Sequence, residues 1–136
     1  MEKITVTADI NSSLENTWET WNSPEAIKKW CSASDDWGVP SAENDLREGG
    51  KFCTTMAAKD GSFSFDFSGT YTKVIHNSEI HYTLDDSRTV EIHFQSIDNI
   101  IRITETFEAE SQNPIEMQQA GWQAILNNFK KFIEQQ

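Results

Sequence analysis

Glu105 is the residue whose type and position point most directly to chemistry. It lies in residues 101–107, where apolar and polar side chains alternate with the period of a strand. Asp98-Asn99 has the composition of a two-residue hairpin turn, and pairing across this turn places Ile92 opposite Glu105. Glu105 is then the only charge on the apolar face that the two strands share. A carboxylate on such a face must find polar partners, contact water or undergo a rise in its pKa.

The sequence leaves two interpretations of Glu105 open. In the first, the carboxyl group faces an interior cavity and orients a polar group of a bound ligand. In the second, it lies near the rim of the sheet, where it is solvated or paired with a Lys or Arg side chain. Structural networks also place carboxylates in this way, so the residue type does not decide between them.

Two histidines, His81 and His93, lie in neighbouring predicted strands and are candidate metal ligands. Their relative position follows from matching the apolar faces of the two strands. The match predicts that His81 opposes His93 on the outer face of the sheet. A metal site needs three or four ligands, and the neighbouring Thr83 and Glu91 supply at most one more. We therefore expect two solvated histidines, and we predict no metal site and no cofactor.

The two cysteines and the known sequence motifs point to no catalytic residue. Cys31 and Cys53 have no neighbouring His or Lys pattern that would activate a thiolate, and their spacing is not that of metal ligands. The sequence contains no serine-centred elbow, P-loop, dinucleotide fingerprint or zinc signature.

Aromatic side chains are the second informative group, with 5 Trp, 8 Phe and 2 Tyr. Large rigid rings pack imperfectly around one helix, so we expect a residual cavity inside the protein. Trp37 is assigned either to the mouth of this cavity or to simple packing within a loop. The predicted lining consists of Glu105, Trp18, Trp30, Trp37, Phe52, Phe65, Tyr71, Tyr82, Ile92, Phe94 and Trp122.

The elements that must position these residues begin with a strand and two short helices. Residues 4–10 alternate in the manner of a half-buried strand, and residues 11–13 offer N-caps for a first helix. Ser23-Pro24 has the composition that begins a second helix. Residues 32–45 are of mixed character and contain glycine and proline, so we predict a long loop there.

The remainder predicts an antiparallel sheet and a long C-terminal helix. Residues 52–107 show period-two segments separated by turn compositions. Asn113 is the expected N-cap of the last helix, whose wide apolar stripe begins at Trp122. Gly121 is expected where this helix closely approaches its neighbours. The predicted fold class is α+β, with one curved sheet of six or seven strands around the C-terminal helix.

Composition restricts the partners. The chain has 136 residues, with 11 Lys and Arg against 22 Asp and Glu, which gives a formal net charge of −11. Such a field repels phosphate, so nucleic acid and anionic membranes are poor partners. The first residues lack an apolar signal region, and no stretch has the length of a membrane span. We expect one domain over residues 1–136, located in the cytoplasm.

Several short motifs, in their order and spacing, resemble the START-like superfamily (SRPBCC, Bet v 1-like). They look most like its branch related to the C-terminal domain of the activator of the 90-kDa heat-shock protein ATPase. The motifs are Trp18 and Trp21, residues 23–27 with Trp30, residues 46–52, residues 67–71 with Val74, residues 104–108, and Gly121-Trp122 with Leu126. The resemblance implies a helix-grip fold with a hydrophobic cavity between the sheet and the C-terminal helix.

Three functions remain open. We expect binding of a small hydrophobic ligand, lipid-like or aromatic, without catalysis. The resemblance alone implies a second role, activation of a chaperone ATPase, but the eukaryotic co-chaperone also uses an N-terminal domain for which 136 residues leave no room. A cyclase or dehydratase would need an acid–base pair in the cavity, and Glu105 is the only inward ionisable residue that the sequence indicates.

Overall fold

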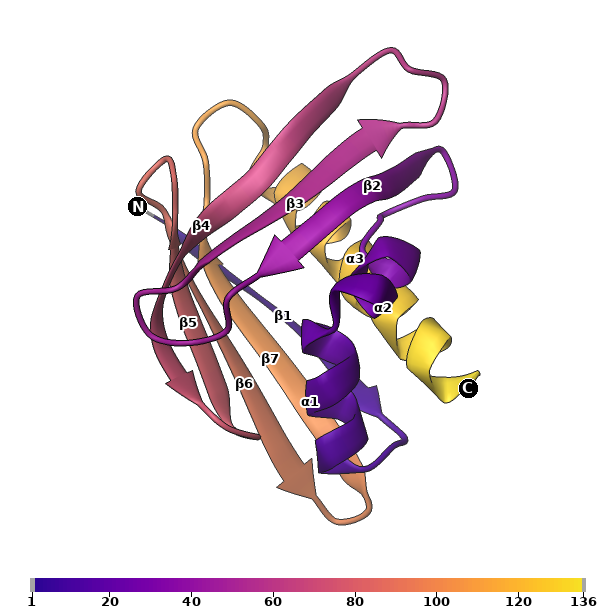
Figure 1. Cartoon of the computed structure of the whole chain (residues 1–136), viewed down its shortest axis with the longest axis vertical. Coiled ribbons are helices and arrows are strands. Elements are labelled where there is room, and N and C mark those ends of the chain that lie inside the picture. Colours follow the sequence, from indigo (N-terminus) through magenta and orange to yellow (C-terminus); the bar gives the residue numbers. More distant parts are fainter. Residues whose placement is uncertain (1, 136) are drawn as a thin grey trace.

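The computed structural model describes residues 2–135, in which seven strands and three helices follow one another in the predicted order. Their bounds are β1 (Lys3–Ile10), α1 (Leu14–Asn22), α2 (Pro24–Trp30), β2 (Trp37–Asn44), β3 (Lys51–Ala58), β4 (Ser64–Ile75), β5 (Glu79–Leu84), β6 (Thr89–Ile97), β7 (Ile100–Glu108) and α3 (Ile115–Glu134). The strands form one antiparallel sheet in the order β1-β7-β6-β5-β4-β3-β2. The sheet is curved, and the three helices lie on one side of it (Figure 1). The predicted α+β helix-grip fold is confirmed.

Local sequence explains where the first two helices begin. The Ser13 hydroxyl accepts a hydrogen bond from the Asn16 amide at 3.0 Å, and the Ser23 hydroxyl accepts one from the Ala26 amide at 3.4 Å. Each bond satisfies an amide that has no partner within its helix. Both caps are the ones that the sequence predicts.

The start of α3 differs from its prediction. The N-cap position is Pro114, and no side chain caps the helix. The Asn113 carbonyl instead accepts a hydrogen bond from the Gln118 side chain at 2.8 Å. Gln118 also accepts a bond from the Glu110 amide and donates one to the Glu110 carbonyl, so its buried amide holds the connection between β7 and α3.

The predicted loop over residues 32–45 is also wrong, because most of it forms the edge strand β2. This strand pairs with β3, and its register shifts between Gly38 and Ser41. Pro40 lies within that irregularity, where the absence of an amide proton breaks no regular ladder. An edge strand with a bulge lacks the clean alternation by which strands are recognised, which is why the pattern looked like a loop.

The register prediction succeeds for one hairpin and fails for another. Between β6 and β7, Ile92 opposes Glu105 as predicted. Between β5 and β6, however, His81 opposes Glu91 and not His93. The true register differs by two residues, and such a shift leaves every side chain on the same face of the sheet. Matching of apolar faces therefore could not distinguish the two pairings.

The tightest packing is found where the helices cover the sheet. α3 packs against β1, while α1 and α2 pack against each other and against α3. Phe129 is fully buried there, and its ring centroid lies 4.9 Å from that of Trp21 and 4.8 Å from that of Trp30. None of the helices within residues 2–135 is both long and apolar enough to cross a membrane.

Candidate functional site

A cavity of about 350 Å³ lies between α3 and the part of the sheet formed by β3 to β7. Most of its wall is apolar. Every strand from β2 to β7 and each of the three helices contributes to the wall. The sequence predicted a cavity in this place, because a straight helix cannot follow a curved sheet along its whole length.

Eight of the predicted residues line this cavity. They are Glu105, Trp30, Phe52, Phe65, Tyr71, Tyr82, Ile92 and Trp122. Trp122 is only half-buried, although we expected it to be mostly buried, because it lies on the cavity wall and not within packed side chains. Its ring stacks on that of Phe107 at a centroid distance of 3.8 Å and an interplanar angle of 10°.

Three predicted residues lie away from the cavity. Trp18 and Phe94 are buried in the packed region under α1, with their ring centroids 5.2 Å apart. Trp37 contacts Phe63 and Phe65 at centroid distances of 6.1 and 6.0 Å, near the β3–β4 hairpin. The assignment of Trp37 to the cavity mouth is therefore wrong, and local packing, here within β2, is what the structure shows. The pattern predicted that Trp18 of α1 and Phe94 of β6 point into the interior, but not that they meet in its filled part.

Glu105 lies inside the protein and not at the rim of the sheet. Its side chain is 5 % exposed, and it forms no hydrogen bond or ion pair with any of residues 2–135. Burial raises the pKa of its carboxyl group to about 8, because the charged form loses water without gaining a partner. At neutral pH the group is therefore mainly a neutral carboxylic acid, which can both donate and accept a hydrogen bond.

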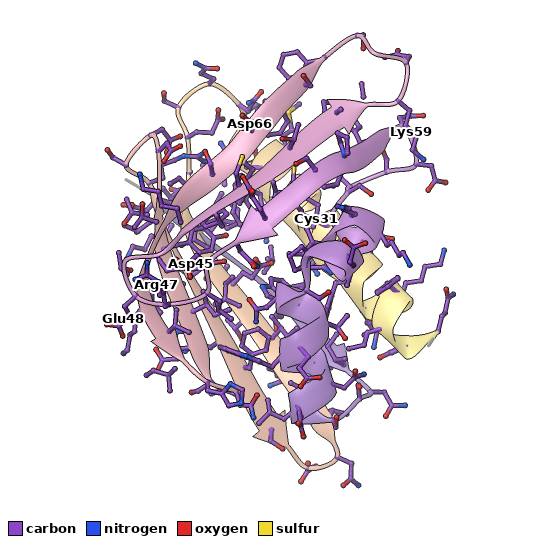
Figure 2. All side chains as sticks on the ribbon, viewed as in Figure 1. Cys31, Asp45, Arg47, Glu48, Lys59 and Asp66 are labelled. Carbon is purple, nitrogen blue, oxygen red and sulfur yellow. The ribbon has the colours of Figure 1, made fainter. Side chains whose placement is uncertain are left out.

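Two further ionisable groups surround this carboxyl. Burial raises the pKa of the Cys31 thiol to about 12, and the Glu105 charge makes a smaller contribution to this rise. The same two causes raise the pKa of the Tyr82 hydroxyl well above its usual value. Figure 2 shows Cys31 at the end of α2, on the inner side of the molecule. Cys31 is therefore a protonated thiol at neutral pH, without the lowered pKa of a reactive cysteine.

The sequence missed the polar residues of the wall. Arg88 comes from the turn between β5 and β6, whereas Glu110, Asn113 and Gln118 come from the connection to α3 and its first turn. Arg88, Glu110 and Asn113 lie outside the helices and strands, so no periodicity marks which of these side chains turn inward, and Gln118 precedes the apolar stripe of α3. The backbone hydrogen bonds of Gln118 are the reason that this connection lies against the cavity.

Comparisons with known proteins agree with this geometry. The model of the family described as "Activator of Hsp90 ATPase homolog 1-like protein" matches residues 11–134. No curated protein matches the sequence. An AHSA1-like protein from Aeromonas hydrophila, solved by solution NMR, is 43% identical with a TM-score of 0.92, over 98% of this chain and 93% of that one.

Two other solved structures extend the comparison. A protein from Cytophaga hutchinsonii is 52% identical with a TM-score of 0.86, over 98% of this chain and 92% of that one. The protein NE0264 from Nitrosomonas europaea has a TM-score of 0.84 at 20% identity, over 98% of this chain and 94% of that one, and shows the shared fold alone. The family match and the two closer structures lead to one conclusion: the chain belongs to the family of activator of Hsp90 ATPase homolog 1-like proteins, within the START-like superfamily.

Proposed function

We propose that this protein binds a small hydrophobic ligand in the cavity, with Glu105 as its polar anchor. The observation that carries the proposal is a buried carboxyl group, with no partner among residues 2–135, in the wall of a mostly apolar cavity of about 350 Å³. Ligand pockets have this character, with mostly apolar walls and a few polar groups that fix orientation. The volume is near the lower end of the usual range of roughly 300–1,000 Å³.

The protonation state of Glu105 narrows the ligand class. A neutral acid favours a neutral ligand with one hydrogen-bonding group, such as a hydroxyl, carbonyl or secondary amine. An anionic ligand is disfavoured by the net charge of −11 and by the mostly apolar wall, in which Arg88 is the only cationic side chain from residues 2–135. Aromatic side chains such as Phe52 and Tyr82 supply contact surface for a flat or branched apolar body.

The first test measures binding of N-phenyl-1-naphthylamine, a neutral fluorescent hydrophobe with one N–H donor. Affinity in the unmodified protein should fall as the pH rises through about 8, because ionised Glu105 must then be buried beneath the probe. In Glu105→Gln this pH dependence should disappear. Glu19→Gln, which changes an exposed carboxylate on α1, is the matched control and should keep it. A pH dependence that is identical in all three proteins would refute the assigned role of Glu105.

The second test identifies the natural ligand. Native mass spectrometry of freshly purified protein should show a co-purifying small molecule that Trp122→Ala fails to retain. If the same molecule is retained by Trp122→Ala, it occupies another site and the proposal fails for this cavity.

One observation favours catalysis as a second candidate. Tyr82 is a second inward ionisable group in the cavity wall, and the Glu105 charge contributes to the rise in its pKa, so the two groups are candidates for the pair that a cyclase or dehydratase requires. Chemical conversion of the co-purified molecule by fresh protein, lost in both Glu105→Gln and Tyr82→Phe, would establish the enzyme. Return of the molecule unchanged would leave binding alone.

The family description supports a third candidate, stimulation of a chaperone ATPase. We propose it as the alternative function, and it predicts a measurable rise in the ATPase rate of the 90-kDa heat-shock protein when this chain is added. Co-purification of that chaperone would favour the same function.

A further inference from the structure

Four polar side chains form a compact group on the outer face of the sheet, opposite the cavity. Glu79 and His81 lie in β5, and Glu91 and His93 lie in β6. The register pairs Glu79 with His93 and His81 with Glu91. The two imidazoles therefore occupy one diagonal of a square and the two carboxylates occupy the other.

The atoms of this group converge from both strands. Glu79 Oε1 lies 2.8 Å from His81 Nε2 and 3.9 Å from His93 Nδ1. Glu91 Oε1 lies 3.7 Å from His81 Nε2 and 3.6 Å from His93 Nε2. His93 thus presents one ring nitrogen to each carboxylate. Ligand atoms of Glu79, His81 and His93 all lie within 4.8 Å of one another.

We propose that Glu79, His81 and His93 form a surface site for a divalent transition-metal ion, with Zn²⁺ as the preferred ion. The ligands are Glu79 Oε1, His81 Nε2 and His93 Nδ1, and water fills the remaining position. Two imidazoles and one carboxylate suit Zn²⁺, whereas Mg²⁺ and Ca²⁺ prefer oxygen ligands throughout.

Glu91 has a separate role in this site. Once His93 Nδ1 binds the ion, His93 Nε2 carries the proton and donates it to Glu91. A carboxylate that accepts from the second nitrogen of a metal-bound imidazole fixes the ring and strengthens the ligand. Glu91 is therefore a positioning residue and not a ligand.

The rearrangement that binding requires is small. Ligand atoms in a tetrahedral Zn²⁺ site with bonds of about 2.0–2.1 Å lie roughly 3.3 Å apart. The side chains of Glu79, His81 and His93 are partly exposed, so rotation about their side-chain bonds brings them to that spacing without movement of the strands.

Lys73 is the group that opposes the ion. Its ammonium lies 3.5 Å from Glu79 Oε1, and its residue pairs with His81 across β4 and β5. A metal ion must displace this ammonium from Glu79. Substitution of Lys73 by Gln should therefore tighten metal binding several-fold, an effect that an unrelated site would not show.

The experiment follows thermal unfolding of chelator-treated protein on addition of Zn²⁺, together with the absorption spectrum of Co²⁺ as a probe. We expect a saturable rise in Tm at one ion per chain and a Co²⁺ spectrum without thiolate bands. His81→Ala and His93→Ala should abolish both signals. His76→Ala is the matched control, because His76 lies elsewhere, with its ring 5.5 Å from that of Trp18.

Two further variants test the role of Glu91 and exclude a contribution from a thiol. Glu91→Gln should weaken Zn²⁺ binding by about 10- to 100-fold while leaving the stoichiometry at one. Cys53→Ser should change nothing. The proposal is overturned if Zn²⁺ gives no saturable shift, if the shift survives in His81→Ala or His93→Ala, or if it disappears in Cys53→Ser.

Discussion

The interior of this protein has two halves with similar side chains and different packing. Around α1 and α2, the rings of Trp18, Trp21, Trp30, Phe94 and Phe129 contact one another at centroid distances between 4.8 and 5.9 Å and pack closely, and only Trp21 and Trp30 among them also reach the cavity wall. Over β3 to β5, the rings of Phe52, Phe67, Tyr71 and Tyr82 contact one another at distances between 4.7 and 6.3 Å, yet they border a cavity.

The difference arises from the helices and not from the aromatic residues. α3 packs against β1 and α2, while the sheet continues from β1 toward β2 and curves away (Figure 1). α1 covers β6 and α2 covers β2, and the space that remains between the helices and β3 to β5 is the cavity. Aromatic side chains thus form a core where two layers meet and the wall of a cavity where they separate.

The largest expected effect is in the packed half. Phe129→Ala removes a ring that is 0 % exposed and contacts both Trp21 and Trp30. Truncation of a fully buried Phe costs about 3–5 kcal/mol in the free energy of unfolding. Urea denaturation measures this change, and an unfolding midpoint equal to that of the unmodified protein would mean that this half is not the core.

The pH dependence of stability tests the open half. The pKa of Glu105 is about 8 in the folded protein against an ordinary value of 4.5. Because this acid holds its proton more tightly when folded, its contribution to stability is complete below pH 4.5 and is lost as the pH rises toward about 8. At 1.36 kcal/mol per pKa unit, a shift from 4.5 to about 8 corresponds to a full loss of roughly 5 kcal/mol.

Glu105→Gln isolates that contribution. Between about pH 5 and about pH 8, the free energy of unfolding of Glu105→Gln should rise relative to that of the unmodified protein. The reason is that only the unmodified protein must bury a charge as Glu105 loses its proton. The other carboxyl groups with shifted pKa values, Asp9 among them, are lowered and act in the opposite direction in both proteins, so they cancel. A constant difference across this range would show that Glu105 is solvated.

A smaller loss is expected for Trp122→Ala. The Trp122 ring stacks on Phe107 but is half-buried beside the cavity. Its removal therefore enlarges an existing space and breaks fewer contacts than the removal of the Phe129 ring. We expect a cost of about 1–3 kcal/mol, below the range for a fully buried ring. A loss equal to that of Phe129→Ala in urea would erase the contrast between the two halves.

The smallest effect is predicted at the neighbouring glycine. We expected Gly121 to mark a close approach of α3 to its neighbours, but a Cβ atom built there meets nothing within 4 Å. Gly121→Ala should therefore stabilise the protein by about 0.5–1 kcal/mol through helix propensity and the unfolded state. Destabilisation measured by thermal unfolding would show that α3 lies closer to the sheet than the structure indicates.

The sequence by itself determined the features that depend on neighbouring residues. Ser13 and Ser23 begin their helices through bonds to amides three residues away, and the Asp98-Asn99 turn sets the pairing that brings Glu105 opposite Ile92. In each case the interacting groups are close along the chain, so periodicity and turn composition fix the geometry before the rest of the protein folds.

Only the tertiary structure decided the features that join distant segments. A shift of two residues keeps every side chain on its face, so face matching predicted the wrong pairing of β5 with β6 and missed that Glu79 meets His93. β2 is a strand because β3 supplies its partners. Trp18 lies in a filled core because α1, which carries it, packs its ring against Phe94 of β6, whereas Tyr82 faces a cavity that α3 leaves open. Local patterns determine which face a side chain occupies; the layer packed against that face determines whether it becomes core or site.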